Sequence, residues 1–250
     1  MKILLVADLH YTLRQWDWVL SVGDRFDMVV VAGDLLDIGS IVPLEAQIVV
    51  VRKYLDRIAA KAPLLVSSGN HDVLDAPAGD ERNAEWLLKE LPEGVHVDGA
   101  GIERDGLFLS VLPWWDGPHK RREIEAQLES QSSQAKGKRW IWIYHPPPVE
   151  TEVSWDGRAD HGDTHLKEWL REHRPWLVLG GHIHNAPFVR GGSWIDQFED
   201  SFLFNSGRQL GGVPTFTLID TDAENAKWIS IEDAEQADLK GALQRRPLDE

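Results

Sequence analysis

The 250-residue sequence contains no cysteine. This absence excludes disulfide bonds, thiolate metal sites and cysteine nucleophiles, so any metal bound by the chain must have nitrogen and oxygen ligands. No apolar run approaches the length of a membrane span, and the amino-terminal run at residues 1–7 becomes acidic at Asp8, too early for a secretory signal. We therefore expect a cytoplasmic protein that does not enter a membrane.

Basic residues are also few. The chain has 26 Lys and Arg against 41 Asp and Glu, a formal net charge of −15 at pH 7. Binding to a nucleic-acid backbone requires clustered Lys and Arg, so nucleic acid is a disfavoured but still open partner. The length and the hydrophobic share of 42% predict one domain over residues 1–233, followed by a charged tail or short helix at 234–250. The oligomeric state is left open.

Apolar runs and helical spacings alternate through the first 91 residues, which is typical of β-α units. The chain then changes to short apolar runs separated by Asp98-Gly99 and Asp105-Gly106, the turn dipeptides of antiparallel hairpins. A polar linker is expected at 131–138. The predicted strands are 2–7, 28–32, 64–67, 95–97, 100–104, 107–112, 139–144, 176–179, 194–204, 215–219 and 228–231, and the predicted helices are 13–22, 43–60, 81–91, 119–130 and 166–172.

Histidine, aspartate and asparagine gather just after several of these strands. Side chains two apart on a strand share a face, and ligand sites in α/β sheets collect at the carboxyl ends of strands. Histidine and carboxylate are the usual ligands of borderline metals, so the pattern predicts a metal centre. The segments are Asp8-Leu9-His10, Gly33-Asp34, Gly69-Asn70-His71-Asp72, His145 and Gly181-His182-Ile183-His184.

This ordered set resembles the calcineurin-like metallophosphoesterase family, whose pattern is D-x-H, G-D-x-x-D, G-N-H-D/E, H and G-H-x-H. The resemblance runs from Asp8 to His184 and implies a four-layer α/β/β/α sandwich of two mixed β-sheets. It also implies two divalent metal ions, for which Mn, Fe and Zn are all plausible, with Asp34 as the bridge. One ion would be held by Asp8, His10, Asp34 and His184, and the other by Asp34, Asn70, His145 and His182.

Such a centre predicts hydrolysis of a phosphate ester. Two divalent cations, two carboxylates and one bridging hydroxide leave a charge of about +1 that attracts phosphate. A bridging hydroxide between two metals roughly 3.5 to 4 Å apart can attack phosphorus directly, so no protein nucleophile is needed. We expect a small phosphodiester or phosphomonoester as substrate. A metal-dependent nuclease is the alternative, and a non-catalytic metal-binding scaffold is the third hypothesis.

The resemblance also implies catalytic roles for two residues outside the ligand set. His71 would stand beside the leaving oxygen as a proton donor or transition-state stabiliser, and the carboxylate of Asp37 would orient it. Ile38 stands where the serine/threonine protein phosphatases usually have arginine. This departure disfavours a protein phosphatase. Gly-Asn-His-Asp also differs from the Gly-Asn-Arg-Asp of lipid A precursor hydrolases, and a histidine at this position is usual in a diesterase or nuclease-like branch, which is therefore favoured.

Three residues are candidate substrate contacts. Arg208 is expected either to contact phosphate or to form a surface ion pair. Trp114 and Trp115 could stack on a base, although core packing is favoured for them. A second D-x-H string at residues 163–165 follows no strand, so we interpret Asp163 or Thr164 as the N-cap of the next helix.

Overall fold

The computed structural model describes residues 1–248 and contains two mixed β-sheets. The larger sheet has the strand order β14-β13-β12-β11-β1-β2-β3-β4. Its strands are β1 (Lys2–Val6), β2 (Met28–Ala32), β3 (Leu64–Ser67), β4 (Val95–Val97), β11 (Phe216–Asp220), β12 (Asn225–Ile229), β13 (Ala234–Asp238) and β14 (Gln244–Pro247).

The smaller sheet has the order β5-β6-β7-β8-β10-β9. Its strands are β5 (Gly101–Arg104), β6 (Leu107–Val111), β7 (Arg139–Ile143), β8 (Leu177–Gly180), β9 (Ile195–Phe198) and β10 (Ser201–Asn205). The helices are α1 (Leu13–Val22), α2 (Leu44–Ala59), α3 (Glu85–Leu88), α4 (Pro118–Ala135) and α5 (Leu166–His173), with short 3₁₀ helices at Gly23–Arg25, Glu152–Ser154 and Ala186–Phe188.

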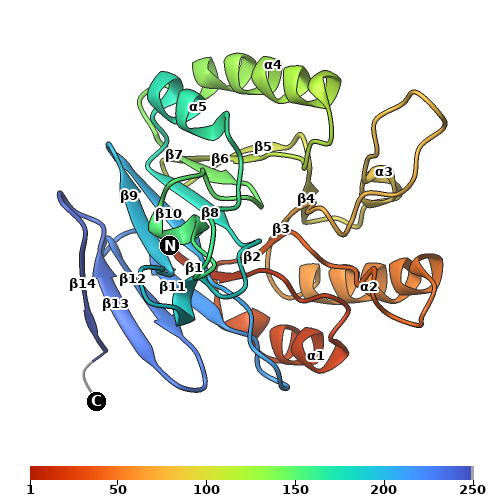
Figure 1. Cartoon of the computed structure of the whole chain (residues 1–250), viewed down its shortest axis with the longest axis horizontal. Coiled ribbons are helices and arrows are strands. Elements are labelled where there is room, and N and C mark those ends of the chain that lie inside the picture. The colour runs from red at the N-terminus through yellow and green to blue at the C-terminus, as the bar shows by residue number, and fades with distance from the viewer. Residues whose placement is uncertain (249–250) are drawn as a thin grey trace.

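Three buried apolar clusters define four layers. Alternate residues of β1, such as Ile3 and Leu5, pack with Ile141 and Ile143 of β7 between the two sheets. The opposite face of the larger sheet packs against α1 and α2, and the opposite face of the smaller sheet packs against α4 and α5. Figure 1 shows these two pairs of helices on opposite sides of the sheets. The expected four-layer α/β/β/α sandwich is therefore confirmed.

The strands that end near the predicted ligands are parallel to one another within each sheet. In the larger sheet β1 pairs with β2 and β2 with β3, all parallel. In the smaller sheet β7 lies parallel to β8. Parallel neighbours end at the same edge, so the segments after β1, β2 and β3 meet at one edge, and those after β7 and β8 at another.

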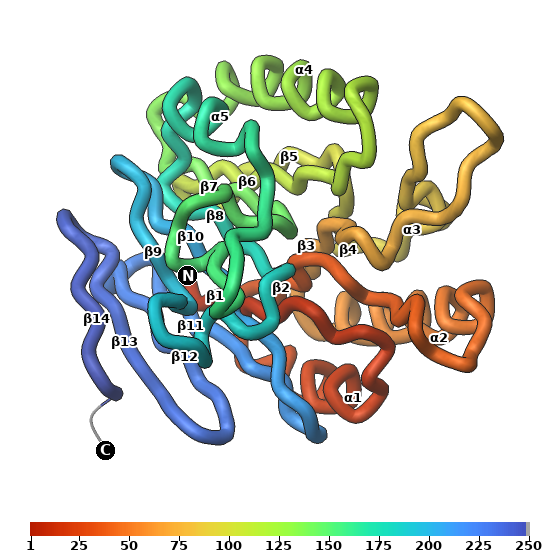
Figure 2. The backbone as a smooth tube through the Cα atoms, in the orientation of Figure 1, coloured from red at the N-terminus to blue at the C-terminus, as the bar shows by residue number. Residues whose placement is uncertain are grey.

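Several predicted elements have the expected bounds, but the helix predicted at 81–91 is wrong. Only Glu85–Leu88 is helical. The Glu81 carboxylate instead accepts hydrogen bonds from the backbone N–H groups of His119 and Lys120 at the start of α4, and Arg82 pairs with Asp116. These contacts hold the segment before α3 in a non-helical form, and Figure 2 shows it projecting beside α3 as an orange-yellow loop.

Three further expectations differ from the structure. β4 lies parallel to β3 in the larger sheet, so Asp98-Gly99 connects the two sheets and only Asp105-Gly106 closes a hairpin, between β5 and β6. The strand predicted at 194–204 is a hairpin of β9 and β10. Helix α4 continues to Ala135 through most of the expected linker because Gln131 and Ala135 are buried.

The carboxyl-terminal prediction is also wrong. Residues 234–247 form neither a frayed tail nor a short helix but the strands β13 and β14, which extend the larger sheet. Ala237 is buried, whereas all four residues of β14 are exposed, as suits an edge strand. Residues 249–250 of the predicted tail lie outside the described residues. No helix within residues 1–248 combines the length and apolar content needed to cross a lipid bilayer.

Candidate metal centre

The predicted ligands lie directly after the strands that were expected to carry them. Asp8 and His10 follow β1, Asp34 follows β2, and Asn70 follows β3. His145 follows β7 of the second sheet, and His182 and His184 follow β8. Five strand ends from two sheets thus supply one site, which explains why its residues are spread over most of the chain.

Four of these side chains form the first ligand group, namely Asp8, His10, Asp34 and His184. One ligand atom from each lies within 4.8 Å of the others. His10 Nε2 is 2.9 Å from His184 Nε2 and 3.5 Å from Asp34 Oδ2. His184 Nε2 is 3.4 Å from Asp8 Oδ1. Imidazole nitrogens and carboxylate oxygens that converge in this way are suited to hold a divalent cation.

The second ligand group contains Asp34, His145 and His182, with ligand atoms again within 4.8 Å of one another. His145 Nε2 lies 3.4 Å from Asp34 Oδ1. This nitrogen and Asn70 Oδ1 are both buried without a hydrogen-bond partner. Burying such groups unpaired is costly, and a cation in this group would satisfy both. The donor set therefore fits the expected pair of metals, with Asp34 common to both groups.

The backbone reaches this arrangement through unusual conformations and close contacts. Asp8, His10, Asp34 and His182 all have positive φ, between 41° and 77°. A Cβ on Gly33 would lie 2.3 Å from His145 Nδ1, and one on Gly69 would lie 2.2 Å from Asp34 Oδ1. Strained backbone of this kind is typical of functional sites. The close contacts explain why glycine directly precedes a ligand in three of the motifs, at Gly33, Gly69 and Gly181.

Burial and neighbouring charges shift the pKa values of four groups of the site, namely His10, His182, Asp34 and His145. Burial lowers the pKa of His10 to about 4 and, together with repulsion from His145, lowers that of His182 to about 4. Burial opposes both charges of the Asp34–His145 pair, but their mutual attraction lowers the pKa of Asp34 and raises that of His145. The neutral imidazoles of His10 and His182 offer the lone pairs that a metal requires.

His71 lies at the mouth of the site, but the expected hydrogen bond to Asp37 is not formed. His71 Nε2 is 3.9 Å from Asp34 Oδ2, and its ring makes an edge contact with His10 at 4.4 Å between centroids. His71 Nδ1 is buried without a hydrogen-bond partner. Asp37 Oδ1 instead accepts from Gly39 N at 2.9 Å, because the tight turn after Asp37 brings this N–H close to its carboxylate.

The two tryptophans have different surroundings. Trp114 lies beside the site, with its ring centroid 5.4 Å from that of His182 and 6.0 Å from that of His145. Trp115 donates a hydrogen bond to the buried carboxylate of Asp163, which also accepts one from the hydroxyl of Tyr144. Trp115 is thus engaged in packing, and only Trp114 borders the ligands.

The second D-x-H string, at residues 163–165, contains a buried aspartate with a structural role. Its side chain holds Trp115 and Tyr144 and also accepts from His165 N at 2.6 Å. The predicted N-cap is wrong, because the residue before α5 is His165, which makes no side-chain capping bond. The buried hydrogen bonds occupy the Asp163 carboxylate instead.

Arg208 is connected to the site through its backbone. Arg208 N donates to His184 O at 3.1 Å. Its guanidinium forms no ion pair with any other residue in the range 1–248. Of the two expectations for Arg208, the surface ion pair is therefore not observed, and the phosphate contact stays a prediction.

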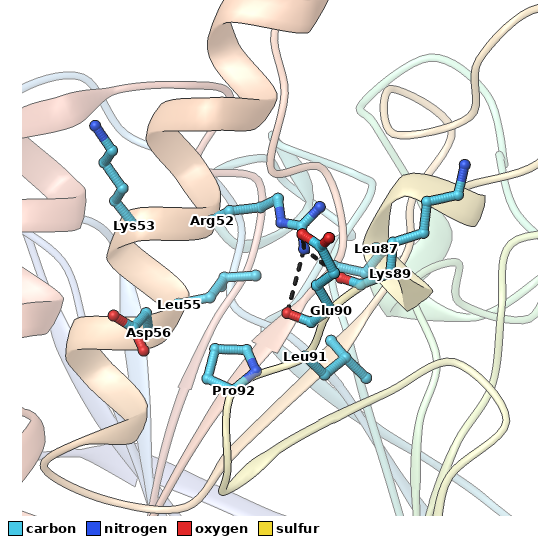
Figure 3. Close-up of a pocket in the computed structure, with 9 residues that line it drawn as sticks. All are labelled: Arg52, Lys53, Leu55, Asp56, Leu87, Lys89, Glu90, Leu91 and Pro92. Carbon is cyan, nitrogen blue, oxygen red and sulfur yellow. Dashed lines mark hydrogen bonds and ion pairs between the residues drawn. The ribbon is translucent and has the colours of Figure 1, made fainter.

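A pocket of about 360 Å³ lies between α2 and the segment after α3, with an apolar floor that includes Leu55 and Leu87 (Figure 3). Arg52 donates to the carbonyl oxygens of Lys89 and Glu90 at its edge. None of the nine lining residues belongs to a ligand group, so this pocket is separate from the metal centre.

Sequence reasoning assigned no role to Asp72, although it ends the Gly69-Asn70-His71-Asp72 run. Its side chain is fully buried and accepts backbone hydrogen bonds from Leu35, Leu36 and Gly69. Burial and repulsion from Asp34 raise its pKa, whereas the N–H donors oppose this shift. The one available signal was its place as the last residue of this motif.

Comparison with known proteins indicates the same family as the motifs that form this site. The family model described as calcineurin-like phosphoesterase matches residues 1–186. Purple acid phosphatase 21 of Arabidopsis thaliana is 24% identical over 189 residues, which cover 69% of this chain and 42% of the plant protein. The chain therefore spans less than half the length of this relative.

Solved structures share the fold at low sequence identity. The protein TT1561 of Thermus thermophilus superposes with a TM-score of 0.61 at 14% identity, over 98% of both chains. Purple acid phosphatase PPD1 from yellow lupin (Lupinus luteus) seeds superposes with a TM-score of 0.56 at 12% identity, over 99% of this chain and 52% of that one. The chain belongs to the calcineurin-like phosphoesterase family, as its motifs predicted.

Proposed function

We propose that the protein is a binuclear-metal-dependent hydrolase of phosphate esters. The observation that supports this proposal most directly is the pair of ligand groups that share Asp34. Asn70 Oδ1 and His145 Nε2, which are buried without a hydrogen-bond partner, are both free to bind a metal in the second group. Asp8, His10, Asp34 and His184 would hold one ion, and Asp34, Asn70, His145 and His182 the other.

Two divalent cations bound there would supply positive charge for the phosphoryl oxygens and an activated water for attack on phosphorus. The chain's own groups hold this centre in place. Asp8 and Asp34 balance part of the cationic charge from fully buried positions, and Ala32 O accepts a hydrogen bond from His145 Nδ1 at 2.7 Å. A hydrogen bond from the ring nitrogen that does not bind the metal fixes the orientation of a ligating imidazole.

His71 is the proposed proton donor to the leaving oxygen. Its side chain is 22% exposed, so a substrate can reach it, while its Nε2 remains 3.9 Å from the Asp34 carboxylate. An imidazole that a substrate can reach beside the ligand groups is suited to act as a general acid. In this structure Asp37 does not orient the ring, so His71 acts in our proposal without that partner.

The proposed substrate is a small phosphodiester or phosphomonoester. Trp114 borders His182 and provides an apolar surface for the group attached to phosphorus. Ile38, which is 61% exposed, stands where an arginine would bind phosphate in the protein phosphatases, so this chain lacks that cation. The proposed metals are Mn, Fe or Zn, because neutral nitrogen and amide donors beside carboxylates suit all three.

Protein stripped with a chelator and reloaded separately with Mn²⁺, Fe²⁺ or Zn²⁺ tests this function. We expect hydrolysis of bis-p-nitrophenyl phosphate or p-nitrophenyl phosphate with at least one metal, and loss of hydrolysis in the stripped protein. Elemental analysis should find about two ions per chain in the active form. A fully loaded protein that cleaves neither ester would show that the proposed function is wrong.

A further inference from the structure

The carboxylate of Asp72 connects the two loops that carry the central ligands. Its Oδ1 accepts hydrogen bonds from Leu35 N at 2.9 Å and Leu36 N at 3.0 Å. Its Oδ2 accepts from Gly69 N at 2.8 Å. The loop after β2 and the loop after β3 are thus joined through one side chain.

The connection is reciprocal. Asp34 Oδ1 accepts a hydrogen bond from His71 N at 2.9 Å, in the loop that contains Asp72. Each loop therefore contributes a carboxylate that binds backbone N–H groups of the other. The donors to Asp72 are adjacent to or two residues from a ligand, since Leu35 and Leu36 follow Asp34 and Gly69 precedes Asn70.

A contribution to general stability does not explain this arrangement. Burying a carboxylate costs free energy that an apolar residue at the same position would avoid, and the three N–H donors only offset that cost. Asp72 is completely buried and is not a member of either ligand group. What the carboxylate adds is directional: a fully hydrogen-bonded buried group restricts its surroundings to one arrangement.

We propose that Asp72 is a positioning residue that sets the separation of Asp34 from Asn70 and the placement of His71. The inference rests on the proposed function, in which Asp34 and Asn70 bind the same ion. It adds a prediction that the proposed function does not make. Loss of the Asp72 carboxylate should weaken the Asn70 side of the centre more than the other side, because Asp8, His10 and His184 lie on other loops and only Asp34 is shared.

The experiment compares Asp72→Asn with the wild type. An amide has one acceptor oxygen in place of two, so its NH₂ group would face an N–H donor and displace one loop. Titration of Zn²⁺ into chelator-stripped protein should show one site weakened by about 10- to 100-fold and the other by a clearly smaller factor, because the two sites share only Asp34. Asp72→Glu, which keeps both oxygens, should restore most of the lost affinity.

Asp163→Asn is the matched control. Asp163 is also buried and accepts three hydrogen bonds, but none comes from the loops after β2 and β3. Its substitution should lower the free energy of unfolding while leaving both Zn²⁺ affinities within about 2-fold of the wild type. Equal weakening of both sites in Asp72→Asn, or wild-type binding at both, would overturn the positioning role.

The titration contains no substrate, so its result tests the positioning role of Asp72 independently of the proposed hydrolase function. A wild type that binds two ions but hydrolyses no ester would contradict only the proposed function. If Asp72→Asn does not fold, amide hydrogen exchange in the wild type decides the question. Slow exchange at Leu35, Leu36 and Gly69 that becomes slower with Zn²⁺ supports the proposal, and exchange that Zn²⁺ does not change overturns it.

Discussion

His145 is oriented by the main chain of Ala32. A carbonyl oxygen can only accept, so the 2.7 Å contact between His145 Nδ1 and Ala32 O places a hydrogen on Nδ1. When the ring is neutral, Nε2 then carries the lone pair, and it lies 3.4 Å from Asp34 Oδ1. The contact joins the end of β2 in one sheet to the end of β7 in the other, so the packing of the sheets determines the direction of this ligand.

Replacing the shared carboxylate should affect both metal sites. We expect Asp34→Asn to lower the affinity for both ions and to reduce kcat by at least about 100-fold, because Asp34 belongs to both ligand groups. Metal content by elemental analysis and hydrolysis of bis-p-nitrophenyl phosphate check this expectation. Full occupancy by two ions in Asp34→Asn would contradict the bridging role.

Gly33→Ala tests the close contact with His145. The added Cβ would lie 2.3 Å from His145 Nδ1, at a position whose φ is +84°. The imidazole would have to move and lose its hydrogen bond to Ala32, so metal affinity should fall by about 10-fold or more. Gly106→Ala is the control, because its φ is +76° but no atom lies within 4 Å of the added Cβ. If the two variants lose equal affinity, backbone strain alone is responsible.

His71→Asn should separate catalysis from metal binding. Both ions should remain, because His71 belongs to neither ligand group, while kcat should fall by about 100-fold or more. The loss of rate should be larger for esters of alcohols, which are poor leaving groups, than for p-nitrophenyl esters. Only an alcohol needs a proton from the enzyme as it leaves. A variant that loses metal but keeps its rate when reloaded would reverse the assigned roles.

Asp98 should make stability depend on pH. Burial raises its pKa to about 6 from 3.8, although the carboxylate accepts a hydrogen bond from Ser68 N at 2.9 Å. Between these pH values the folded protein holds a proton that the unfolded chain releases, so this group makes the folded state less stable as pH rises. Asp98→Asn should therefore gain stability relative to the wild type on going from pH 4 to pH 7, by about 2 kcal/mol. Urea unfolding of metal-free protein at both pH values checks this, and a pH-independent difference would contradict it.

Much of the fold was predictable because buried strands and amphipathic helices leave strong local patterns. α1, β2 and β3 have the bounds expected from periodicity alone. The errors occur where long-range contacts override local preference. The helix expected at 81–91 is shortened by the contacts of Glu81 and Arg82 with the start of α4, and β13 and β14 carry too few apolar residues to be recognised as strands.

The sequence by itself determined the chemistry of the site, because nitrogen and oxygen ligands at successive strand ends, in a chain without cysteine, permit few other interpretations. Only the tertiary structure decided how these side chains are held. The bond from His145 to Ala32, the turn that engages Asp37 and the three contacts of Asp72 join residues through space. Hydrogen bonds depend on distances and angles set by the packing of two sheets, and a pattern of residue types along the chain does not contain those distances.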